Sequence, residues 1–223
     1  MKLKLLSLQF TILFAFFLLP PVFVPPENTA SLSFSPLVFV YLILGVLLNI
    51  QSYRLKKMFA PVYSQKPGKF TYITTGTICF GIMMILFALV QIIGLIFPET
   101  SNAANFENLN LNPFKFSAIV FQLAVISFEE EVLYREFCPL CLDAFAAGKD
   151  LKFRKVYKIT AEIFMLLIFA AGHRCLGLIA VLNAFLCGIV LRVCAFKTDS
   201  ICTGSIIHFI YNLINFLLLI SGK

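Results

Sequence analysis

The sequence predicts an all-α fold, a polytopic integral membrane helix bundle of about seven transmembrane helices, and two observations carry that prediction. First, 60% of the 223 residues are apolar and 13% are charged, whereas a soluble domain averages roughly 45–50% apolar and about 25% charged residues. Second, apolar runs long enough to cross a bilayer, about 20 residues each, follow one another along the chain. Little sequence is left over for a soluble domain.

The first predicted helix, Leu5–Val24, follows two lysines as the core of a signal peptide would. Its apolar part is longer than a signal core, and the segment after it lacks the small-x-small cleavage pattern, so we expect a retained membrane helix. Periodicity and length predict six further helices. These cover residues 34–52, 71–97, 114–136, 159–173, 176–196 and 201–220.

The basic residues lie between the apolar runs and on alternate sides of them. The net charge of +7 comes from 18 Lys and Arg against 11 Asp and Glu. The basic loops precede the first run and follow the second, fourth and sixth, so the positive-inside rule explains them without a nucleic-acid partner. We expect an integral protein of the plasma (inner) membrane whose partner is the lipid bilayer, with a cytoplasmic N-terminus and an external C-terminus.

The seven cysteines lie mostly inside or beside apolar runs. A free cysteine in such a position behaves as a small hydrophobic residue, so no disulfide framework is predicted. Cys138 and Cys141 have the spacing of a redox or metal motif, but they lack a second cysteine pair. We expect them to pack near a helix end broken by Pro139.

Ionisable residues cluster at the end of the fourth apolar run. A charged side chain at the bilayer centre costs at least about 2.5–3.5 kcal/mol on insertion scales, so it needs a partner or a function. The segment Ser127–Glu136 carries four of the carboxylates in the chain and one guanidinium. Glu131 and Arg135 are spaced i, i+4 and can form an ion pair along one helix face. Glu130 points about 100° away from Glu131 and is free to face a neighbouring helix.

The only two histidines in the chain lie in the fifth and seventh apolar runs. Phe169 and His173 are spaced i, i+4, as are His208 and Asn212, so each pair is expected to share a helix face. At 1.5 Å per residue, Glu130 and His208 fall at matching depths in the membrane. His173 matches that depth only if its helix begins outside the membrane or is kinked. A carboxylate, two imidazoles and a carboxamide on three helices are what a membrane-embedded hydrolytic site requires.

These residues resemble the three ordered motifs of the CAAX protease and bacteriocin-processing (CPBP) family, also called type II CAAX prenyl endopeptidases or glutamate intramembrane proteases. The motifs read Glu130-Glu131-x-x-x-Arg135, Phe169-x-x-x-His173 and His208-x-x-x-Asn212. The resemblance divides the chain into N-terminal helices without catalytic motifs, 1–113, and a catalytic core, 114–223.

The resemblance implies an intramembrane endopeptidase whose Glu130 and His173 activate a water molecule and whose His208 and Asn212 stabilise the oxyanion. Phe169, Glu131 and Arg135 would support the site. The implied substrate is a membrane-attached peptide or protein, for which the family offers a prenylated C-terminus as one candidate, and no cofactor is implied.

The sequence departs from the family pattern at three positions. Glu136 stands where the family usually has Gly, Arg192 lies where small residues are common, and a third carboxylate, Glu129, precedes the expected pair. A frame that uses Glu129 as the base remains open, although Glu130 has the right spacing to Arg135. We expect Glu162 and Arg192 to lie at the membrane interface.

Three alternatives stay open. Glu130, His173 and His208 could form a two-His-one-carboxylate zinc site with an open position for water, which would make the protein a zinc-dependent metalloprotease. A non-enzymatic immunity or binding protein could use the same polar cluster to hold a peptide or a lipid. A small proton-coupled transporter is the third, but the sequence shows no repeats or broken-helix signals of that class.

Overall fold

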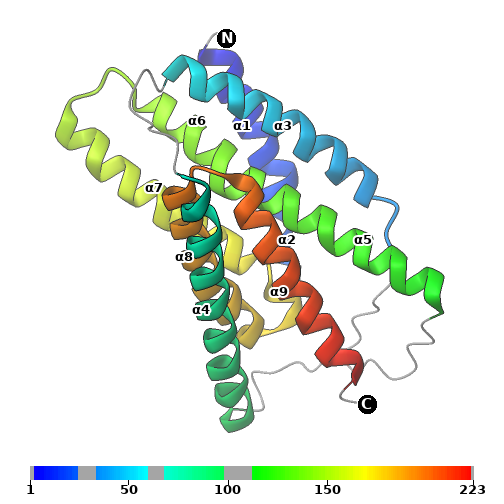
Figure 1. Cartoon of the computed structure of the whole chain (residues 1–223). Coiled ribbons are helices and arrows are strands. Elements are labelled where there is room, and N and C mark those ends of the chain that lie inside the picture. Colours follow the sequence, from blue (N-terminus) through cyan, green and yellow to red (C-terminus); the bar gives the residue numbers. More distant parts are fainter. Residues whose placement is uncertain (1–2, 25–33, 60–67, 98–111, 222–223) are drawn as a thin grey trace.

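The computed structural model describes residues 3–24, 34–59, 68–97 and 112–221, and these ranges form a bundle of helices without any strand (Figure 1). The N-terminal helices are α1 (Leu3–Leu13), the π-helix η1 (Phe14–Leu18), α2 (Pro20–Phe23), α3 (Val38–Phe59) and α4 (Lys69–Ile96). The rest are α5 (Pro113–Glu130), the π-helix η3 (Glu131–Phe137), α6 (Cys138–Phe145), α7 (Leu151–Ala171), the 3₁₀ helix η4 (Arg174–Leu176), α8 (Leu178–Thr198) and α9 (Ile201–Ser221). The predicted all-α class is confirmed.

Five of the helical segments in the described part of the chain are long and apolar enough to cross a membrane. They are Leu3–Phe23, Val38–Lys57, Lys69–Ile96, Leu178–Thr198 and Ile201–Ser221. The other two predicted spans do form helices, α5 with η3 and α7, but neither is among the five. Charged side chains account for this: α5 ends in two glutamates, and α7 opens with four basic residues in its first eight. The count of seven is therefore not confirmed. The two segments outside the five, α5 with η3 and α7, carry site residues.

Local chemistry sets the ends of the helices that lead to the site. The Asn112 side chain accepts a hydrogen bond from the Lys115 backbone N–H, and Pro113 opens α5, which satisfies a backbone donor at the helix start. Asp150 caps α7 in the same way. Gly177, with φ of 96°, makes the turn into α8, where a side chain would be strained.

Two buried clusters join the N-terminal helices to the rest of the bundle. In the first, leucines of α1 and α3 pack against η3 and α6, and it includes Leu6, Leu55, Phe137, Cys138 and Cys141. In the second, α4 packs against α8 and α9. Cys138 and Cys141 are buried free thiols, so they fill the core as the sequence predicts. Helices from both halves of the chain therefore position the residues of η3 and α9.

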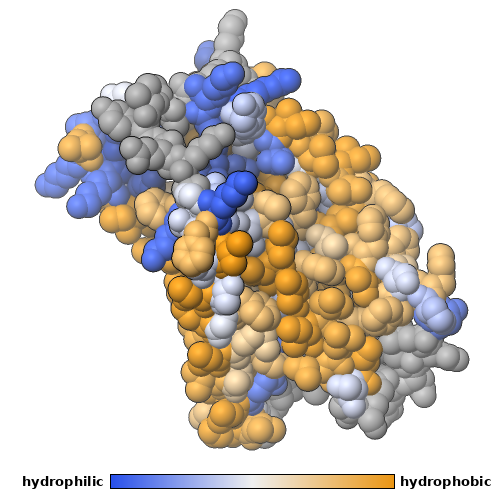
Figure 2. Space-filling model, viewed as in Figure 1, coloured by the Kyte–Doolittle hydropathy of each residue, from blue (hydrophilic) through white to orange (hydrophobic). Residues whose placement is uncertain are grey.

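The outer surface is apolar over most of its area. Large hydrophobic side chains stand exposed on several helices; Phe16, Phe70, Leu95 and Phe196 are each at least 73% accessible. Figure 2 shows a broad hydrophobic surface on the visible face, with hydrophilic residues gathered at the end where α7 begins. Soluble monomers rarely expose apolar patches larger than a few hundred Å². The surface, together with the five spans, is that of an integral membrane protein.

Candidate active site

The site begins where α5 changes from an α-helix to a π-helix. η3 starts at Glu131, directly after Glu130, and continues to Phe137. π-Helical turns are rare and occur frequently at functional sites. Here the Arg135 carbonyl accepts a hydrogen bond from Arg192 Nη1 of α8 at 2.7 Å. A side chain from another helix thus bonds to the backbone of the irregular turn and ties it to α8.

Glu130 and Glu131 approach His208 of α9 from the two sides of its ring. His208 Nδ1 lies 3.0 Å from Glu131 Oε1, and Nε2 lies 3.7 Å from Glu130 Oε2. Glu131 is fully buried and His208 is 5% exposed. The matching depth predicted for Glu130 and His208 therefore corresponds to a close approach of the two side chains.

Glycine at position 204 of α9 makes room for Glu131. A Cβ placed on Gly204 would lie 2.8 Å from Glu131 Oε2, closer than real Cβ contacts. Oε2 has no hydrogen-bond partner among the described residues. The carboxylate is held through Oε1, which faces both His208 and Arg135.

Arg135 connects this carboxylate to α7. Its Nε lies 3.6 Å from Glu131 Oε1, the i, i+4 pair that the spacing indicates, and its guanidinium carbon lies 3.8 Å from the centroid of the Phe169 ring. Such a cation–π contact is worth about 2 kcal/mol or more when it is desolvated, and Arg135 is 5% exposed. The Phe169 ring also packs edge-on against Tyr134 at 5.1 Å.

His173 lies past the end of α7 rather than on its face. α7 ends at Ala171, and His173 precedes the short helix η4 with φ of −89° and ψ of 6°. The helix predicted to run to residue 173 thus ends two residues earlier, at Ala171. Phe169 and His173 touch: His173 Nδ1 lies 2.9 Å from the Phe169 carbonyl oxygen, and the ring centroids are 4.9 Å apart.

Asn212 is the second of the predicted site residues on α9. Its side-chain amide donates a hydrogen bond to Ser127 Oγ of α5 at 3.1 Å. Ser127 is fully buried and sits one turn before Glu131. The sequence analysis assigned Ser127 no role, and its position in the same run of polar residues was the available signal.

Glu162 and Arg192 form an ion pair between α7 and α8. Arg192 Nε donates to Glu162 Oε2 at 2.7 Å, and Arg192 Nη2 pairs with the other carboxylate oxygen. That the two lie at the membrane interface stays a prediction; the structure adds that each side chain is half-buried and pairs with the other. The Arg192 guanidinium thus binds both the Glu162 carboxylate and the Arg135 carbonyl oxygen.

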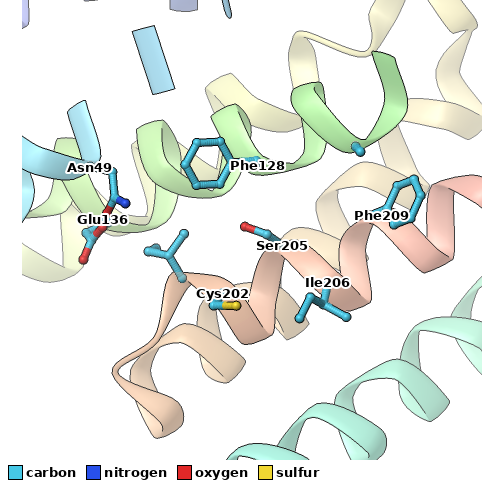
Figure 3. Close-up of a pocket in the computed structure, with 9 residues that line it drawn as sticks. Asn49, Phe128, Glu136, Cys202, Ser205, Ile206 and Phe209 are labelled. Carbon is cyan, nitrogen blue, oxygen red and sulfur yellow. The ribbon is translucent and has the colours of Figure 1, made fainter. Parts of the chain in front are cut away.

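A cavity of about 440 Å³ lies between α3, α5 with η3, and α9. Figure 3 shows Phe128 and Ser205 facing each other across it, with Asn49 and Glu136 at one end and Phe209 at the other. Its α9 wall includes neighbours of the site residues, since Ser205 follows Gly204 and Phe209 follows His208. The walls are mainly apolar.

The zinc alternative finds no ready ligand set. Within the described ranges, no three His, Cys, Asp or Glu side chains are grouped as metal ligands would be. Glu130 and His208 approach each other, while the recorded contacts of His173 are with Phe169. As arranged, these residues do not fit a two-His-one-carboxylate centre.

Part of the chain matches a known protein family. Residues 112–214 match the family described as "Type II CAAX prenyl endopeptidase Rce1-like". The matched range begins at the cap of α5 and ends within α9, so it contains every residue of the site. No curated protein and no solved structure matches the chain.

Proposed function

We propose that the chain, which belongs to the Rce1-like type II CAAX prenyl endopeptidase family through residues 112–214, is an intramembrane endopeptidase that uses Glu130 as its general base. The observation that carries the proposal is the placement of Glu130 Oε2 at 3.7 Å from His208 Nε2, inside the bundle. A carboxylate and an imidazole that face one position can hold a water molecule and a scissile carbonyl together.

In the proposed mechanism, Glu130 and His173 activate the water molecule. The Phe169 carbonyl can only accept a hydrogen bond, so Nδ1 of His173 must carry the proton and Nε2 of a neutral ring is left as an acceptor. An acceptor nitrogen suits a residue that orients an attacking water. Glu130 takes the proton as the water oxygen bonds to the carbonyl carbon, and that proton later goes to the leaving amine. The products are a carboxylic acid and an amine.

In the proposed mechanism, His208 and Asn212 stabilise the oxyanion. Glu131 lies against Nδ1 of His208, so an oxyanion donor at Nε2 requires a doubly protonated ring, with Glu131 as its counter-ion. Asn212 uses one N–H on Ser127, and its amide carries a second N–H that can face the substrate. Loss of one such donor typically costs about 100- to 1000-fold in rate.

The proposed substrate is a membrane-attached peptide or protein, with a prenylated C-terminus as the first class to test. The cavity between α3, α5 and α9 is mainly apolar, which suits an extended segment or a lipid chain that enters from the bilayer. The distribution of basic residues supports an N-terminus in the cytoplasm, and the plasma (inner) membrane is the proposed location.

The test is cleavage of an internally quenched farnesylated CAAX peptide by protein in liposomes. We expect Glu130→Gln to lower the rate by at least about 100-fold. Glu129→Gln is the matched control, because it removes the adjacent buried carboxylate from a residue with no recorded contact to His208. Equal loss in both variants, or loss only in Glu129→Gln, would reject Glu130 as the base.

Two further results would each favour one of the alternatives, the zinc-dependent mechanism or the binding protein. One zinc held per protein, whose removal abolishes cleavage and whose return restores it, would replace the metal-free mechanism. Tight peptide binding without cleavage of any lipidated or transmembrane peptide would favour the binding-protein alternative.

A further inference from the structure

The first helical stretch of the chain runs beside α7 towards the turn that carries His173. The Phe14 ring of η1 stacks on the Phe164 ring of α7, with the ring centroids 6.0 Å apart. Leu18, at the end of η1, is fully buried, and α2 then packs against both α7 and η4. The N-terminal stretch therefore reaches from the middle of α7 to the turn after it.

Pro21 of α2 lies against this turn. A Cβ placed on Gly172 would lie 3.6 Å from Pro21 Cβ, which is an ordinary van der Waals separation. Pro21 is half-buried, whereas Pro20 before it is exposed. Two prolines open α2, and the ring of each fixes its own φ near about −65°. Pro21 therefore presents a rigid surface to the residue that precedes His173.

The turn that carries His173 lies between two glycines. It begins at Gly172 and ends at Gly177, whose φ is 96°, and glycine allows the backbone more conformations than any other residue. The contacts recorded for the His173 side chain are with Phe169, which belongs to the same stretch of chain. Packing from a distant part of the chain, such as that of Pro21, limits how far such a turn can move.

We infer that Pro21 is a positioning residue for His173: by packing against Gly172, it keeps the imidazole directed towards the water that Glu130 deprotonates. The inference rests on the proposed function for that water and deepens it. It also brings to the site a residue from outside the range 112–214 that matches the family. The N-terminal helices, which carry no catalytic motif, thus contribute to the chemistry through the turn after α7.

Cleavage of the farnesylated peptide by Pro21→Gly, with Pro20→Gly as the matched control, tests this inference. Both changes release a proline φ in α2, but only Pro21→Gly removes the Cβ that faces Gly172. We expect Pro21→Gly to lower kcat about tenfold with KM within about twofold, because the water is misaligned while the substrate contacts remain. Pro20→Gly should stay within about twofold of the wild type. Pro21→Ala keeps the Cβ and should retain at least about half of the wild-type kcat.

A readout of His173 itself does not depend on turnover. The chain has two histidines, so NMR spectra of protein with ¹⁵N-labelled histidine give two sets of ring signals, which His173→Gln assigns. In the wild type, we expect the His173 ring to hold its proton at Nδ1, which faces the Phe169 carbonyl. In Pro21→Gly the two tautomers should exchange, so that the Nδ1 and Nε2 shifts approach each other, and in Pro20→Gly they should not.

Three results would each overturn the inference. They are an equal loss of kcat in Pro21→Gly and Pro20→Gly, a loss in Pro21→Ala as large as in Pro21→Gly, and unchanged His173 signals in Pro21→Gly. A wild type that cleaves no peptide would reject the proposed function alone. A change of the His173 tautomer in Pro21→Gly and not in Pro20→Gly would then still support the positioning role.

Discussion

The two histidines of the site are held in opposite ways. His208 lies inside α9, is 5% exposed, and has carboxylates near both ring nitrogens. His173 lies in the turn after α7, is only partly buried, and is held by the carbonyl and ring of Phe169. A residue fixed by buried charges is part of the packing as well as the chemistry. A residue fixed from a turn can be changed with less effect on the fold, and this difference can be tested.

The largest effect is expected from Glu131→Ala. Removing one partner of a buried ion pair typically costs about 3–5 kcal/mol, because the remaining charge is left uncompensated, and Arg135 is 5% exposed. Cleavage should fall by more than about 1000-fold, since His208 also loses its counter-ion. Thermal unfolding in detergent, read alongside the rate, checks both expectations. An unchanged unfolding midpoint would show that Arg135 does not depend on Glu131.

His173→Gln should separate activity from stability. We expect the cleavage rate to fall by about 100-fold, while the unfolding midpoint stays within about 2 °C of the wild type, because a change away from buried charge and core packing usually costs little. His208→Gln in the same assay should lower both quantities. If His173→Gln lowers stability as much as His208→Gln, the contrast between the two histidines is wrong.

Residue spacing predicted the site residues that lie within helices better than it predicted His173, which lies in a turn. Glu131, Arg135 and His208 are located by regular spacing, because a helix fixes which side chains share a face. The end of the fifth predicted helix was placed two residues too late, because α7 ends at Ala171 and glycine in an apolar run does not by itself mark a helix end. The family resemblance itself rested on the motif order and is confirmed by the match over residues 112–214.

The interhelical contacts were harder to predict. Arg192 with Glu162, Asn212 with Ser127, and Lys56 with Glu136 join residues at least 30 positions apart, and spacing along one helix carries no information about such pairs. The π-helix η3 was not predicted, because nothing in its sequence, EVLYREF, distinguishes a π-helix from an α-helix.

A smaller effect is expected from Gly204→Ala, which sharpens the contrast on the His208 side. The added methyl group would lie 2.8 Å from Glu131 Oε2, so the carboxylate must move while its charge and its partners remain. We expect a rate loss of about tenfold, with overpacking costing about 1–3 kcal/mol of stability. Gly81→Ala is the control, because a methyl group there meets nothing within 4 Å. Equal behaviour of the two variants would mean that the site tolerates movement of Glu131.

The smallest effect is expected from the ion pair of Arg192 and Glu162, which joins α8 to α7 and from which Arg192 also bonds to the backbone of η3. Because the Arg192 and Glu162 side chains are 30% and 28% exposed, solvent and headgroups screen their attraction, and a double-mutant cycle with Arg192→Gln and Glu162→Gln should give a coupling of about 0.5–1 kcal/mol. Arg192→Gln also removes the donor to the Arg135 carbonyl, whereas Glu162→Gln leaves that donor in place. Arg192→Gln should therefore lower the cleavage rate more than Glu162→Gln does, and equal rates would show that the turn keeps its shape without α8.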